Sequence, residues 1–223
     1  MFRNTGLIGA ALLCRLAIAQ SDTPTIIQPG APGQPGKMIS SAVFALPPPA
    51  KEDIEFMQAM IVHHSQAVDM VALLRKRGAN PALQTLGERI TLSQADEIES
   101  MKQWLRERNE SIEMGAMMHH HTPGMDMSKM AAGDVAVMPG MLSPNQMKVL
   151  AKASGRAFDT LFLTGMIQHH SGAVDMVDDL FAAGAGQDNV LFDFATDIDN
   201  SQRAEIRIMQ GMLTKMARPK DKK

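Results

Sequence analysis

The chain has 223 residues and a formal net charge of −2, from 22 basic and 24 acidic side chains. Nucleic acid is excluded as an expected partner, because phosphate binding needs a basic surface and only 4% of the residues are aromatic and able to stack on bases. A single cysteine excludes a disulfide-stabilised scaffold. The unusual residue is methionine, whose 20 copies outnumber the 17 glycines.

Residues 1–19 are predicted to be a secretory signal peptide. Arg3 gives a positive start, a short apolar run follows, and Ala17 and Ala19 are small residues spaced as a cleavage site needs. The run is shorter than the roughly 20 apolar residues that cross a bilayer, and no later segment is a candidate. We therefore expect a mature chain without a membrane span, located in the periplasm or otherwise exported after cleavage.

A repeated motif dominates the remainder of the chain. Residues 56–71 read FMQAMIVHHSQAVDMV and residues 162–177 read FLTGMIQHHSGAVDMV. Each copy is followed by a second similar segment, SQADEIESMKQWL from Ser93 and SQRAEIRIMQGML from Ser201. Because an internal repeat indicates the architecture, we expect two copies of one helical hairpin. The predicted boundaries are a Pro/Gly-rich linker at 20–50, a bundle domain at 51–217 with hairpins at 51–109 and 155–217, and a His/Met-rich connection at 110–147.

The spacing of apolar residues predicts helices. In both copies apolar residues recur at alternating steps of four and three, which is typical of one helix face, whereas Asp69 and Asp175 fall on the opposite face. Asn80-Pro81 is typical of a helix start, and the sequence from Ser143 to Gln146 resembles a capping box that opens a short helix. Neither copy shows the alternation of apolar and polar residues that is typical of a strand. The predicted fold is therefore all-α, with the two hairpins packed as a four-helix bundle.

Polar side chains interrupt these apolar faces at matching heights. The pairs His63-His64 and His169-His170 straddle the apolar stripes of the first helix in each hairpin. A buried carboxylate without a partner is costly, so a glutamate on an apolar face should meet a proton, a cation or a metal. The sequence predicts two equivalent layers of His, Met, Gln and Glu, and leaves open whether they form one site or two. The glutamates at the height of the histidines are Glu97 and Glu205.

The residue types in these layers favour copper. Thioether sulfur is a soft ligand and imidazole a borderline one, a combination that suits Cu(I) best, with Cu(II) as the alternative. Zinc gains little from methionine. A further cluster, MGAMMHHHTPGMDMSKM at residues 114–130, lies in the connection, and we expect the methionines of this cluster not to pack a core. Its candidate metal ligands are Met117, Met118, His119, His120, His121, Met125 and Met127.

The segments MIVHHSQAVDM and MIQHHSGAVDM, together with MPGMLSPNQM and AFDTLFLTGM, resemble the family known as domain of unknown function 305. The resemblance covers about residues 50–217 and implies a ferritin-like helical domain of exported bacterial proteins, some of which bind copper through Met and His and support copper tolerance. Matched residue by residue, it points to Met60, His63, His64 and Met70, and to Met166, His169, His170 and Met176. The layers add Glu97, Met101, Glu205 and Met209 as metal-site candidates.

The expected function is copper sequestration or delivery rather than catalysis, since no catalytic constellation is evident. The implied partners are the metal ion and a copper exporter or another periplasmic copper protein, and the oligomeric state stays open. One alternative is a ferritin-like oxidoreductase with a dinuclear iron or manganese centre, which requires about four carboxylates where this core offers Glu97 and Glu205. The other is a metal-free helical interaction module, in which methionines such as Met70 and Met176 fill the core and the histidines hydrogen-bond to the glutamates.

Overall fold

The computed structural model describes residues 26–28, 33–39, 48–114, 134 and 136–218, and divides the chain into two compact units, Met1–Leu46 and Pro47–Lys223. The first unit contains the antiparallel strands β1 (Ile26–Gln28) and β2 (Lys37–Ile39), in which Ile27 pairs with Met38. A short strand ladder thus lies within the Pro/Gly-rich segment that the sequence predicts to be a linker.

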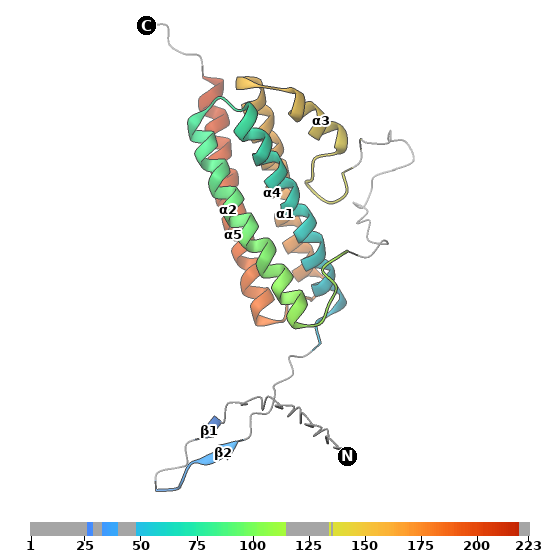
Figure 1. The fold of residues 1–223 in the computed structure, drawn as a ribbon, viewed down its shortest axis with the longest axis vertical. Coiled ribbons are helices and arrows are strands. Elements are labelled where there is room, and N and C mark those ends of the chain that lie inside the picture. The colour runs from blue at the N-terminus through green and yellow to red at the C-terminus, as the bar shows by residue number, and fades with distance from the viewer. Residues whose placement is uncertain (1–25, 29–32, 40–47, 115–133, 135, 219–223) are drawn as a thin grey trace, which may run out of the picture. The chain divides into compact units, whose positions relative to one another are not determined.

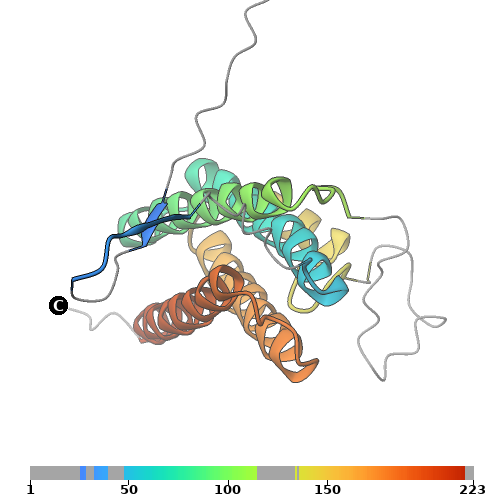
Figure 2. The same ribbon diagram turned by 90° about the horizontal axis from the view of Figure 1, so that it is seen from below.

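The second unit is built from helices (Figure 1), with bounds α1 Lys51–Arg77, α2 Pro81–Glu107, α3 Pro144–Lys152, α4 Gly155–Ala182 and α5 Asn189–Ala217. Helix α1 packs on α2, α4 packs on α5, and the two hairpins meet through α1 and α4. Figure 2 shows the hairpins as two layers. The all-α four-helix prediction is confirmed. Within the part of the chain that the structure describes, no helix combines the length and hydropathy that crossing a membrane requires.

Local sequence signals set the helix boundaries as predicted. The Asn80 side chain accepts a hydrogen bond of 3.0 Å from the Ala82 amide, and proline occupies the first turn of α2. At the start of α3, the Ser143 hydroxyl accepts from the Gln146 amide at 3.2 Å, while the Gln146 side chain accepts from the Ser143 amide at 2.7 Å. This reciprocal pair is the predicted capping box.

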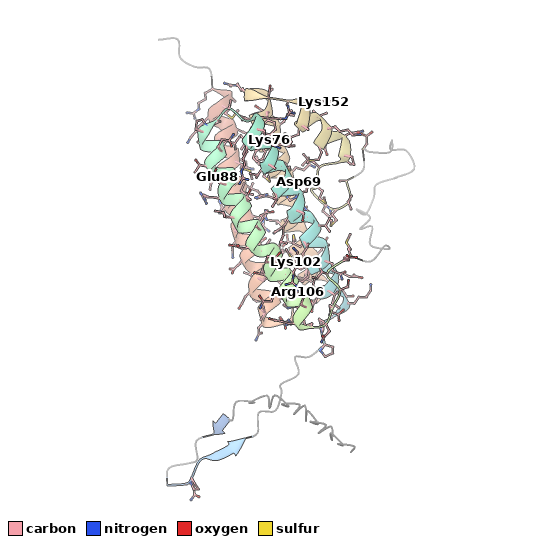
Figure 3. The ribbon with its side chains drawn as sticks, in the orientation of Figure 1. Asp69, Lys76, Glu88, Lys102, Arg106 and Lys152 are labelled. Carbon is pink, nitrogen blue, oxygen red and sulfur yellow. The ribbon has the colours of Figure 1, made fainter. Side chains whose placement is uncertain are left out.

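The apolar core consists of two clusters, one on each side of the histidine level. One cluster joins the start of α1 to the ends of α2 and α4 and includes Phe56, Met60 and Trp104. The other joins the end of α1 to the start of α4 and includes Leu74 and Phe158. Asp69 and Asp175 are both exposed as predicted, and Asp69 is labelled on α1 in Figure 3.

Helix α2 finishes at the end of the bundle where α1 begins, whereas α4 begins at the opposite end. The connection between α2 and α4 therefore has to run from one end of the bundle to the other. Residues 138–142, which we term the strap, pack against α1 and α4. Gly140 has φ +72°, and a Cβ on Gly172 would lie 2.1 Å from the Pro139 carbonyl oxygen, so the close approach requires glycine. Strap residues Met138 and Met141 are 2% and 7% exposed.

The prediction that the methionines of residues 114–130 do not pack a core is wrong at Met114. This side chain is partly buried and packs against the cluster that contains Phe56, because the chain leaving α2 stays against the bundle for several residues. The candidate ligands from Met117 to Met127 lie outside the described residues, so their part of that prediction is untested.

Candidate metal centre

The four bundle histidines form a single cluster in the middle of α1 and α4. His63, His64, His169 and His170 all have no exposed surface. The rings of His63 and His169 face each other across the two hairpins, with centroids 3.9 Å apart and an interplanar angle of 40°. The two polar layers that the sequence predicts therefore merge into one.

The outer histidines of the cluster, His64 and His170, are each held by a glutamate from the other helix of the same hairpin. Nε2 of His64 lies 2.7 Å from Glu97 Oε2, and Nε2 of His170 lies 2.7 Å from Glu205 Oε2. This confirms that the glutamates and histidines lie at the same height. Burial acts to raise the pKa of Glu97, but the hydrogen bonds from His64 and Ser93 outweigh it and the pKa is lowered. The carboxylate is therefore ionised and accepts the Nε2 proton of His64.

Main-chain carbonyls hold the inner histidines of the cluster, His63 and His169. Nε2 of His63 lies 2.9 Å from the Pro139 oxygen, and Nε2 of His169 lies 2.8 Å from the His63 oxygen. Because a carbonyl only accepts, both rings carry a proton on Nε2. Burial, followed by repulsion from neighbouring histidines, lowers the pKa of His63 to about 3 and the pKa of His169 well below its ordinary value. Both rings are therefore neutral, with a lone pair on Nδ1.

The Nδ1 atoms of all four histidines are buried and have no hydrogen-bond partner. The side-chain oxygens of Gln94 and Gln202, at the same level, are also buried without a partner. Leaving such acceptors unpaired costs roughly 1–3 kcal/mol each. A histidine that donates its Nε2–H to a carboxylate or carbonyl, and keeps a free lone pair on the other nitrogen, has the arrangement of a metal ligand with its supporting hydrogen bond. The donor set therefore fits a cation.

Buried methionines belong to both apolar clusters that flank the histidine level. Within the described residues, no three His, Cys, Asp or Glu side chains are grouped so as to hold a metal ion by themselves. A metal at this position would thus combine imidazole with thioether, a donor set that favours a soft ion. The candidate methionines Met60, Met70, Met101, Met166 and Met209 are fully buried, and Met176 is 8% exposed. Their role as ligands, like that of Glu97 and Glu205, stays a prediction.

Two aspartates that bind one hairpin to the other were missed by the sequence reasoning. Asp53 Oδ1 accepts from the Gly186 amide at 2.7 Å, and Asp159 Oδ1 accepts from the Ala79 amide at 3.0 Å. Each therefore ties the start of one hairpin to the turn of the other. The available signal was a shared Asp-x-x-Phe at the front of both motif copies. No feature of the sequence predicts the contact between the Pro139 carbonyl and His63, because a main-chain contact depends on the path that the connection takes.

Comparison with known proteins gives one family. The model of the family described as "Domain of unknown function (DUF305)" matches residues 53–213. The search of curated proteins found no match.

Solved structures of the same family share the fold. A DUF305 fragment from Deinococcus radiodurans is 29% identical, with a TM-score of 0.61 over 76% of this chain and 99% of that chain. A DUF305 protein from Streptomyces coelicolor that is described as secreted is 27% identical, with a TM-score of 0.62 over 77% of this chain and 98% of its own. CopM in a Cu(I)-bound form is 25% identical, with a TM-score of 0.56 over 74% of this chain and 98% of that chain. Other CopM structures hold Cu(II) or Ag.

Proposed function

Because the chain belongs to the DUF305 family, we propose that it is an exported copper-binding protein that sequesters copper or delivers it. The observation that carries the proposal is the set of four buried histidines whose Nε2 atoms are each taken by an acceptor and whose Nδ1 atoms have no partner. The copper- and silver-bound structures of CopM support the same class of ion.

Cu(I) is the favoured ion, with Cu(II) as the alternative. The proposed donors are imidazole nitrogens of histidines without exposed surface, together with the thioether sulfurs of the candidate methionines. Such donors suit a soft monovalent ion, which needs no ligand to lose a proton and costs less to bury than a divalent ion. Magnesium, calcium and manganese prefer oxygen ligands, but the carboxylates at this level are already paired with histidines, and the unpartnered amide oxygens of Gln94 and Gln202 carry no charge to balance a divalent ion.

The proposed role is binding rather than turnover. The two glutamates that border the histidines are engaged in orienting them, with side chains 19% and 15% exposed, and neither is placed as a free acid or base. We propose the periplasm or another exported compartment as the location, which the secreted relative from Streptomyces coelicolor supports. A copper exporter or another periplasmic copper protein is the proposed partner in delivery.

Competition with a Cu(I) chelator tests the proposal on the purified exported protein. The variant replaces His63, His64, His169 and His170 together by glutamine, whose amide can still donate in the place of Nε2–H but offers no atom at Nδ1. We expect the copper site of the bundle to be lost while the helical circular dichroism signal is kept.

A matched control replaces His119, His120 and His121 by glutamine and leaves the bundle intact. This control separates copper bound in the bundle from copper bound in the connection. If the variant of the four bundle histidines retains the affinity and stoichiometry of the wild type, the bundle site is wrong.

A further inference from the structure

At the position after the shared His-His-Ser, the two motif copies carry different residues, and both residues touch the strap. Gln66 in HHSQAVDM corresponds to Gly172 in HHSGAVDM. The Gln66 side chain donates to the Leu142 carbonyl at 2.9 Å and accepts from the Leu142 amide at 2.7 Å. Gly172 leaves room for the strap, since a Cβ there would lie 2.1 Å from the Pro139 oxygen. The strap is thus clamped by hydrogen bonds on α1 and by close packing on α4.

The strap contacts the histidine cluster at the ring of His63. Gln66 and His63 are three positions apart on α1 and therefore lie on the same face. Gln66 holds Leu142 at one end of the strap, while the Pro139 carbonyl at the other end lies 2.9 Å from His63 Nε2. His169 depends on no part of the strap, since its Nε2 contacts the His63 carbonyl on α1. The two inner histidines are therefore not equivalent.

We propose that Gln66 is a positioning residue for the His63 end of the candidate copper site. By fixing the strap, it keeps the Pro139 carbonyl on Nε2 of His63, so that the proton stays on Nε2 and the lone pair stays on Nδ1. The part of this inference that concerns metal affinity rests on the proposed function. Gln168 on α4 supports the strap only through two longer bonds of 3.2 Å, to the Gly140 and Met141 carbonyls, and it is exposed.

The test replaces Gln66 by leucine, which has a similar size but neither donates nor accepts. Nitrogen-15 NMR of the metal-free protein then reports which ring nitrogen of each histidine carries the proton. In the wild type we expect His63 to be protonated on Nε2. In Gln66→Leu we expect His63 alone to become a mixture of the two tautomers. Cu(I) affinity should fall roughly 10- to 100-fold, the usual cost of losing a supporting contact of a metal ligand.

Gln58→Leu is the matched control. Gln58 is another glutamine on α1, buried where Gln66 is partly buried, and its side chain donates to the Ser111 carbonyl of the same connection at 2.7 Å. Its loss frees a different stretch of the connection, so the His63 tautomer and the Cu(I) affinity should be unchanged. Equal effects of Gln58→Leu and Gln66→Leu on the His63 signals would overturn the positioning role.

Gly172→Ala gives an independent route to the same result. The added methyl group would displace Pro139 without touching Gln66, and we expect the same mixture of tautomers at His63. A folded Gln66→Leu protein that keeps His63 protonated on Nε2 would overturn the inference. Failure of the wild type to bind Cu(I) would instead overturn the proposed function, because the tautomer measurement needs no metal.

Discussion

At the scale of single residues, the atom that meets Nε2 decides what each core histidine can do. His64 and His170 contact carboxylates, whereas His63 and His169 contact main-chain carbonyls. A carbonyl cannot take up the proton or balance a positive ring. Burial therefore dominates at the inner pair and keeps it neutral.

Stability of the metal-free protein should fall as the pH drops from 6.5 to 4.5. The pKa of His63 and that of His169 are lowered in the folded state from 6.5, so the unfolded chain binds more protons in this window. The stabilisation is complete above pH 6.5 and is lost toward the folded pKa of about 3. We expect a loss on the order of 2 kcal/mol per ring by pH 4.5, measured by urea unfolding.

The control for this pH dependence is the double variant His63→Gln, His169→Gln, which has no inner ring to protonate. Its stability should change much less over the same window. The lowered pKa of Glu97 adds a loss only as the pH falls below that group's ordinary value of 4.5, so it does not obscure the result. An equal slope in the wild type and the variant would contradict the assignment to the inner histidines.

Replacing Met60 and Met166 by leucine should weaken Cu(I) binding with little change in stability. Both side chains are fully buried one turn before a histidine pair. Leucine conserves the volume, which usually costs under about 1.5 kcal/mol per site, but removes the thioether ligand. Chelator competition gives the affinity and urea unfolding gives the stability. Met57→Leu is the control, since Met57 is buried on the same helix as Met60 and is not a candidate ligand. Unchanged affinity in the double variant would show that Met60 and Met166 serve only to pack the core.

At the scale of elements, each hairpin is anchored to the turn of the other. Asp53 near the start of α1 binds the Gly186 amide after α4, and Asp159 near the start of α4 binds the Ala79 amide after α1. The contacts hold α1 and α4 antiparallel and in register. That register sets the height at which His63 meets His169.

Asp53→Ala should destabilise the bundle by about 1.5–3 kcal/mol, the usual range for a hydrogen bond to a charged group. The Gly186 amide is buried, so it would be left without an acceptor, and the Ala50 amide at the start of α1 would lose its contact with Asp53 Oδ2 as well. Urea unfolding measures the change. Asp69→Ala on the exposed face of the same helix should stay within about 0.5 kcal/mol of the wild type.

At the scale of the whole molecule, a polar contact closes the end of the bundle where α2 finishes and α5 starts. Arg108 donates to Asp188 Oδ2 at 2.6 Å, and the Trp104 indole donates to Asp188 Oδ1 at 3.2 Å. The guanidinium lies 4.1 Å from the Trp104 ring centroid, and the Arg108 side chain is 3% exposed. Asp188 also caps α5 through the Leu191 amide. One carboxylate therefore joins the two hairpins.

Asp188→Ala should cost about 3–5 kcal/mol, because it leaves the buried Arg108 charge unpaired and removes the cap of α5. Trp104 is the single tryptophan of the chain, so its fluorescence reports directly on this end of the bundle. We expect a red-shifted emission and a lower urea midpoint that coincides for fluorescence and circular dichroism. A urea midpoint equal to that of the wild type would show that the Asp188 contact does not stabilise the packing of the two hairpins.

Local sequence patterns were enough to predict the helices, their pairing and the height of the polar residues. Apolar spacing, the Asn80 cap and the distance from each turn are local quantities, and they sufficed to place Glu97 level with His64. The residue types in the polar layers favour copper as the proposed metal, since ligand softness follows from residue type.

Tertiary structure alone decided how the two histidine pairs combine. The 3.9 Å approach of His63 to His169 depends on how the hairpins pack, and the Pro139 contact depends on the path of a long connection. Neither is encoded in spacing within one helix, because each joins segments that come together only when apolar surfaces far apart in the chain are buried. The burial of Met114 against the core has the same origin.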